Sequence, residues 1–274
     1  MRFGFVLPGG TAGEQLEQAV LAERSGWDGI FVWEGVAGVD PWSLLAAISQ
    51  HTSRIRLGTM LTPLPWRRPW KVASQVATLD QLSGGRAVLA VGLGATDILP
   101  AGSIEPTDRR LRAELLDEGI DLITAAQAGR PHRGPHFGDY EVRADLVPTA
   151  RPVQQPRVPI WVVGAWPRPK SMRRVLRCDG LLPLCMGQDG YRDTTPDDIR
   201  AMLAWLEAEG GPRPGFDVVV DGETPAGDPQ AAAEQVAPWA EAGCTWWLDV
   251  RWETSPDQMA RVQERLAAGP PPLG

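Results

Sequence analysis

The sequence predicts an α/β fold of the (β/α)8 type, a TIM barrel in which eight parallel strands alternate with eight helices. The length of 274 residues suits one such domain. Short apolar runs rich in Val, Ile and Trp alternate with amphipathic helical runs, and the pair recurs eight times. The apolar runs are nearly continuous, as expected of parallel strands buried on both faces. Their even spacing, and the absence of a GxGxxG pattern after the first run, favour the barrel over a doubly wound open sheet.

The expected elements follow one another in regular order along the chain. The strands are expected at 3–8, 29–34, 55–62, 87–94, 159–164, 180–186, 216–222 and 245–250. The helices that follow them are expected at 14–26, 41–52, 71–84, 108–129, 170–178, 196–210, 229–243 and 257–269. We therefore expect a single barrel domain over 1–269. The tail 270–274 is rich in proline and is expected to be disordered.

A short insertion is expected between the fourth helix and the fifth strand. Residues 129–159 are rich in Pro and Gly and include His132 and His136, with a short hairpin expected around Phe137–Val142. Because the segment follows a helix, it begins at the N-terminal face of the barrel. Barrel chemistry occurs at the opposite face, so the insertion and its histidines are predicted to be structural.

Composition excludes several classes of function. The net charge of −7 and the pI near 5.1 argue against general binding to nucleic acid or to acidic membranes. No signal peptide or membrane-spanning run is recognisable, so a cytoplasmic protein is expected. Cys178, Cys185 and Cys244 follow no metal or redox spacing and are expected to be buried thiols. The three histidines also lack metal-ligand spacing, so no metal site is expected.

Aromatic side chains gather where the expected strands end. Five tryptophans lie at or just past strand ends, namely Trp33, Trp66, Trp70, Trp166 and Trp252. Large apolar walls suit a planar ring ligand, and Trp33 and Trp66 are expected in a substrate pocket. The alternative for each tryptophan is that it packs the barrel rim.

Few acid or base groups stand at the strand ends. Glu34 follows the second strand, between Trp33 and a glycine, and apolar walls would raise its pKa so that it serves as a proton donor. The alternative is an ion pair with a neighbouring arginine such as Arg67 or Arg68. Asp249 and Arg251 follow the last strand and are expected at the substrate pocket, or else to pair with each other. Where protein acid and base groups are few, a cofactor commonly supplies the chemistry.

The stretch VVGAWPRPKS, residues 162–171, predicts an anion site. Pro169 suits the first position of a helix, which places Arg168 at the N-cap. Arginine cannot accept hydrogen bonds from the free amides of the first turn, so those donors, with Lys170, are left to bind an anion such as phosphate. The glycine in this stretch, Gly164, is expected to open space at the end of the strand. The alternative is a helix start capped by water.

Three long runs carry a resemblance to a known family: AERSGWDGIFVWE, DPWSLLAAISQHTSRIRLGTMLTPLPWRRPWKVASQVATLDQLSGGRAVLAVGLG and VPIWVVGAWPRPKSMRRVLRCDGLLP, with a weaker match in AGCTWWLDV. The chain resembles the bacterial luciferase-like flavin-dependent monooxygenases, which include the F420-dependent oxidoreductases. The resemblance implies a TIM barrel that binds FMN or coenzyme F420 at its C-terminal face and acts on a small organic molecule. It further implies a homodimer and, in the FMN case, a separate flavin reductase.

The resemblance also implies which residues hold the cofactor. The ring would contact strands two to four at Glu34, Thr59, Met60, Leu61, Thr62, Gly92, Leu93 and Gly94. A strand-three bulge or a non-prolyl cis peptide near Leu61 and Thr62 would support the ring. The phosphate would be held by Gly164, Ala165, Trp166, Arg168, Lys170 and Ser171.

The sequence departs from the family pattern at two places. Glu34-Gly35 replaces the Asp-His of many relatives, so the usual histidine proton relay is missing. The phosphate turn lacks the double glycine and early serine. Two other functions stay open: a cofactor-free isomerase or lyase acting on a phosphorylated substrate, and a flavin-binding protein without catalysis. Schiff-base chemistry would have to use Lys71 or Lys170, the two lysines of the chain.

Overall fold

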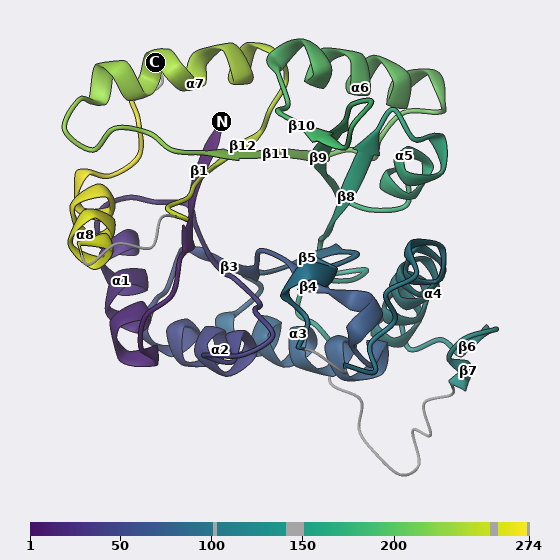
Figure 1. The fold of residues 1–274 in the computed structure, drawn as a ribbon. Helices are drawn as coiled ribbons and strands as arrows, with labels where there is room; N and C mark the ends of the chain where they lie inside the picture. Colours follow the sequence, from purple (N-terminus) through teal and green to yellow (C-terminus); the bar gives the residue numbers. More distant parts are fainter. Residues whose placement is uncertain (101–102, 141–150, 253–256, 273–274) are drawn as a thin grey trace.

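Eight parallel strands close into a barrel surrounded by eight helices, as the sequence predicts (Figure 1). The computed structural model describes residues 1–100, 103–140, 151–252 and 257–272. The barrel strands are β1 (Arg2–Leu7), β2 (Gly29–Val32), β3 (Arg56–Thr59), β5 (Ala87–Gly92), β8 (Ile160–Trp166), β9 (Gly180–Met186), β11 (Asp217–Gly222) and β12 (Trp246–Asp249). Each pairs in parallel with the next, and β12 pairs with β1 to close the ring.

The helices begin where the sequence supplies start signals. They are α1 (Ala12–Arg24), α2 (Pro41–His51), α3 (Pro69–Ser83), α4 (Arg109–Gln127), α5 (Pro169–Val175), α6 (Pro196–Ala208), α7 (Pro229–Glu241) and α8 (Gln258–Ala268). Thr11 and Glu14 form a capping box on α1, and Asp40 and Asp108 accept hydrogen bonds from the first turns of α2 and α4.

The lumen of the barrel is filled by aromatic rings. Phe31 and Trp161 lie 5.3 Å apart between ring centroids, and Trp161 and Trp246 lie 5.5 Å apart. Gly29 makes room for them, since a Cβ there would lie 2.8 Å from the Phe31 ring and 2.9 Å from the Trp246 ring. A Cβ at Gly58 would lie 2.5 Å from the carbonyl oxygen of Val88 on β5. These glycines are therefore required by close packing inside the barrel.

The third expected strand is interrupted in the structure. β3 ends at Thr59, the Met60–Leu61 peptide bond is cis, and a two-residue strand, β4 (Thr62–Pro63), then pairs with β5. The family resemblance implied a cis peptide near this point, which is confirmed one residue earlier. A short antiparallel strand, β10 (Tyr191–Arg192), pairs with β9 and was not predicted.

The insertion contains a hairpin of β6 (His132–Gly134) and β7 (Gly138–Tyr140), earlier than the expected Phe137–Val142, whose residues 141 and 142 lie outside the described part. Glu118 on α4 accepts the backbone N–H groups of His136 at 2.9 Å and Phe137 at 2.8 Å, and it lies 3.6 Å from His132 Nε2. Both histidines therefore fasten the hairpin to α4, which agrees with the predicted structural role.

The C-terminal tail differs from the expected disorder where it is described. The Arg265 side chain donates to the carbonyl of Gly269 at 2.6 Å, and Pro271 is buried. Residues 273 and 274 lie outside the described part. The three cysteines are buried free thiols, as predicted. Within the described chain, the helices are all too short or too polar to cross a membrane.

Replacing Gly58 with alanine tests the packing of the lumen. We expect Gly58→Ala to lower the free energy of unfolding by about 1–3 kcal/mol, because the new Cβ would meet the backbone of β5 rather than a flexible side chain. Gly13→Ala on α1 is the control, since nothing lies within 4 Å of its Cβ position. Urea unfolding of both variants measures the effect. Equal stability of the two variants would contradict this account of the glycine.

Candidate active site

A cavity of about 390 Å³ lies among the loops that follow β2, β4 and β5. These loops leave the C-terminal ends of parallel strands, where barrel enzymes place their chemistry. The residues that line the cavity include Glu34, Val36, Pro63, Trp66, Arg67 and Glu105. The sequence predicted Glu34 and Trp66 as site residues, and the structure brings both to this cavity.

A chain of hydrogen bonds runs from Glu34 into the barrel wall. The Glu34 carboxylate is 6% exposed and pairs with Arg67 Nη1 at 2.9 Å. Thr62 Oγ1 donates to the other carboxylate oxygen at 2.5 Å and lies 2.8 Å from Thr59 Oγ1. Arg67 also donates to Gln75 Oε1 on α3 at 3.0 Å. The alternative of an ion pair with an arginine is thus confirmed, and Thr59 and Thr62 join the same network.

Burial raises the pKa of the Glu34 carboxyl above its ordinary value. The hydrogen bond from Thr62 and the positive charge of Arg67 act in the opposite direction and lower it, but burial is the larger effect. The carboxyl therefore keeps its proton to a higher pH than an exposed glutamate does. This is the property that a proton donor at this position needs.

Beside the cavity, the inner wall of the barrel is apolar. Met60, Leu61 and Val163 pack against the inner cluster that holds Phe31 and Trp161, and all three are partly exposed. This surface lies at the C-terminal ends of β3 and β8. It can support one face of a planar ring.

The turn after β5 is shaped by glycines and anchored by an arginine. A Cβ at Gly92 would lie 3.0 Å from Leu61, and one at Gly94, whose φ is +79°, would lie 2.7 Å from the Trp66 ring. Arg112 on α4 donates to the carbonyls of Leu93 at 3.2 Å and Gly94 at 2.8 Å. These glycines therefore permit close packing within the protein. Sequence patterns gave no signal for Arg112, which lies within an ordinary amphipathic helix.

The turn after β8 has the predicted helix start. Arg168 is the N-cap of α5, Pro169 is the first helical residue, and no side chain caps the first turn. Arg168 and Lys170 are exposed. The Ser171 hydroxyl, however, accepts the backbone N–H of Ala165 at 2.9 Å, so that amide is not free for a ligand.

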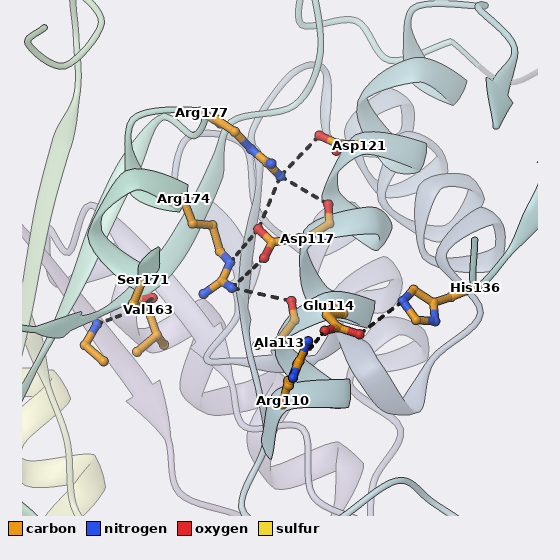
Figure 2. A network of polar contacts seen from close by, with 11 residues as sticks. Arg110, Ala113, Glu114, Asp117, Asp121, His136, Val163, Ser171, Arg174 and Arg177 are labelled. Carbon is orange, nitrogen blue, oxygen red and sulfur yellow. Dashed lines mark hydrogen bonds and ion pairs between the residues drawn. The ribbon is translucent and has the colours of Figure 1, made fainter. Parts of the chain in front are cut away.

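Helix α5 is fixed to α4 by a network of ion pairs (Figure 2). Arg174 is buried, and it donates to Asp117 through Nε at 2.9 Å and Nη2 at 2.7 Å. Arg177 reaches Asp117 at 3.5 Å and Asp121 at 3.2 Å. The network holds the turn after β8 at a fixed place relative to the start of α4.

Two expectations about this turn need correction. Gly164 does not open space for a ligand, because a Cβ there would collide with Leu181 and approach Val175 on α5 at 3.0 Å. The glycine instead allows α5 and β9 to pack closely. The ring of Trp166 packs against Trp205 on α6 at 6.5 Å between centroids, so it faces the helix layer rather than the lumen.

Asp249 and Arg251 lie apart from the cavity beside Glu34. Asp249 is fully buried and pairs with Arg251 at 3.2 Å and with Arg265 at 2.9 Å, and it accepts the Thr224 hydroxyl. The alternative that Asp249 and Arg251 pair with each other is confirmed. Arg251 instead lines a smaller cavity of about 110 Å³.

The remaining tryptophans divide between surface and packing. Trp33 is 43% exposed and Trp252 is 48% exposed. Trp70 packs edge-on against Phe137 of the hairpin at 6.3 Å. Only Trp66 of the five lines the 390 Å³ cavity. In the described residues, no three His, Cys, Asp or Glu side chains come together as a metal site.

Comparison with known proteins gives a consistent result. The model of the luciferase-like monooxygenase family matches residues 1–269. An uncharacterized protein of Mycobacterium tuberculosis is 33% identical over 236 residues, covering 84% of this chain and 76% of that protein. An F420-dependent glucose-6-phosphate dehydrogenase of Kineococcus radiotolerans is 29% identical, covering 93% and 76%. A monooxygenase from Streptomyces bottropensis has the same fold, with a TM-score of 0.75 at 19% identity over 98% of both chains.

The raised pKa of Glu34 predicts a pH-dependent contribution to stability. Between 4.5, the ordinary pKa, and the higher pKa of the native state, the folded protein binds more protons than the unfolded chain. The free energy of unfolding therefore falls through this group as pH rises across that window. Glu34→Gln should lack this decline, so wild type should lose stability relative to the variant as pH rises. Urea unfolding across the window measures the difference.

The control is Glu17→Gln on α1, which changes an exposed glutamate. It gives the baseline for the loss of one exposed carboxyl, against which the effect of Glu34→Gln is compared. The raised pKa would be contradicted if the difference in free energy of unfolding between wild type and Glu34→Gln did not change with pH. It would also be contradicted if wild type became more stable relative to the variant as pH rises.

Proposed function

The chain belongs to the luciferase-like monooxygenase family, whose members are F420- or FMN-dependent oxidoreductases, and we propose that it is an oxidoreductase of this type acting on a small organic substrate. One observation carries the proposal. A buried glutamate with a raised pKa, Glu34, lines a cavity of about 390 Å³ close to the apolar wall at Met60 and Leu61.

The residues at the C-terminal face fit a flavin or deazaflavin cofactor. The apolar surface of Met60, Leu61 and Val163 suits one face of the ring. Arg168 and Lys170 are exposed beside first-turn amides that no side chain caps, and this donor set suits a phosphate. When bound, F420 would supply hydride transfer and reduced FMN would supply reaction with oxygen.

The roles of the protein's own side chains follow from their environments. The raised pKa of Glu34 suits it to pass a proton to a substrate atom in the cavity, and Thr62 and Arg67 fix the direction of its carboxyl. Val36, Pro63 and Leu99 add apolar surface to that cavity. The proton relay thus depends on Glu34 in place of the histidine that many relatives have.

We favour F420 over FMN. Several relatives are named F420-dependent glucose-6-phosphate dehydrogenases, at 29% to 32% identity. Arg68 and Lys170 also lie at the C-terminal face, where they could meet a long anionic tail. If FMN is the cofactor, a separate flavin reductase would be a partner. A homodimer formed through α2 and α3 is part of the same proposal.

The two rival functions find less support. Schiff-base chemistry needs a lysine near the substrate, but Lys71 and Lys170 are both exposed on helices and neither lines the Glu34 cavity. A protein that binds the cofactor without catalysis would retain the binding surfaces but would not need a protonated Glu34.

Fluorescence titration with F420, FMN and reduced FMN tests the proposal. We expect at least one of them to bind, and binding of none would overturn the function. Arg168→Ala and Lys170→Ala should each weaken binding by about 1.5–3 kcal/mol, because each removes a charge-assisted contact to phosphate. The control is Arg24→Ala, an exposed arginine at the end of α1. Unchanged affinity in the first two variants would place the phosphate elsewhere.

Replacing Glu34 with glutamine tests the proton donor. Glu34→Gln keeps the shape of the side chain but removes the exchangeable acid, so turnover should fall by about 10²- to 10⁴-fold. Cofactor affinity in the same fluorescence titration should change much less. Steady-state kinetics of the cofactor-loaded enzyme with a converted substrate give the comparison. Turnover equal to wild type would remove Glu34 from the mechanism.

A further inference from the structure

Asp221 points into the C-terminal end of the barrel lumen. On β11, Val219 packs in the inner cluster with Trp246 and Leu248, whereas Val220 packs in the outer layer beneath the helices. Because side chains alternate along a strand, Asp221 shares the inward direction of Val219. Among the described residues of the barrel strands, only Asp221 and Arg2, the first residue of β1, are exposed.

Asp221 also differs from the other strand-end carboxylates in having no charged partner. Glu34 pairs with Arg67, and Asp249 pairs with Arg251 and Arg265. Across the part of the chain that the structure describes, Asp221 has no ion pair, and the hydrogen bond that it makes is to its own backbone.

The surroundings of Asp221 are apolar although solvent reaches it. It is in register with Leu248 on β12, which belongs to the inner apolar cluster. Protein atoms surround the carboxyl closely enough that burial raises its pKa. Solvent reaches the carboxyl, so a ligand that enters this end of the lumen can contact it directly.

We propose that Asp221 contacts the substrate and selects molecules that present a positively charged or hydrogen-bond-donating group, such as an amine. The inference rests on the proposed function for the location of the substrate. The charges of the cavity beside Glu34, where the substrate is proposed to lie, agree with it. Arg67 pairs with Glu34 there, and Glu105, which lines that cavity, has no ion pair with any described residue. The exposed cations Arg168 and Lys170 lie at the separate turn after β8, where an anion would bind.

Three probes of similar size and different charge test the proposal: benzylamine, benzyl alcohol and benzoate. Their affinities are measured by calorimetry at neutral pH, for the protein alone and for the protein loaded with F420. Wild type should bind benzylamine at least about tenfold more tightly than benzyl alcohol, and benzoate most weakly. Asp221→Asn, which keeps the size of the side chain, should remove the preference for the amine. Asp221→Glu should retain part of it.

Glu17→Gln on α1 is the matched control, since it removes one exposed negative charge far along the chain from β11. It should keep the preference in full. The inference is overturned if wild type binds benzylamine no more tightly than benzyl alcohol, or binds it undetectably. It is also overturned if Asp221→Asn keeps the preference for the amine. The probes are also measured on the protein without cofactor. Failure of F420 and FMN to bind would therefore count against the proposed function, whereas the amine preference of the cofactor-free protein would still test the role of Asp221.

Discussion

The filling of the barrel lumen by Phe31, Trp161 and Trp246 is the constraint on which the rest of the structure depends. The three rings lie 5.3 to 6.0 Å apart and come from β2, β8 and β12, so they join distant parts of the chain in one packed layer. Gly29 and Gly58 are needed because any side chain there would meet these rings or a strand backbone.

The strand alternation then divides the carboxylates of the C-terminal face into different environments. Glu34 pairs with Arg67, and Asp249 pairs with Arg251 and Arg265. Asp221 faces inward and is left without an arginine partner in the described part of the chain. Burial raises the pKa of all three carboxyl groups, but the neighbouring groups that lower the pKa differ from one to the next. Carboxyl groups in contrasting environments on one face are the usual means by which a fold separates proton transfer, substrate binding and structural support.

The segment after β8 is held in place by contacts with helix α4. Arg174 and Arg177 fasten α5 to α4, and Arg112 fastens α4 to the turn after β5. The same helix, α4, therefore contacts both the turn after β5 and the segment after β8. Glu118 on this helix also holds the hairpin of the insertion.

The sequence by itself determined the eight strand–helix units, the uncapped start of α5 and the family, because period, capping and motif are properties of neighbouring residues. It also identified Glu34 with its two alternatives, a proton donor or an arginine pair, and the structure shows the pair with Arg67 together with a raised pKa of the carboxyl. Only the tertiary structure decided that Gly164 serves helix packing and that Trp166 faces α6. It also decided that Asp249 on β12 pairs with Arg265 on helix α8. Each of these depends on which residues distant in sequence lie opposite one another, and that is fixed only when the barrel closes.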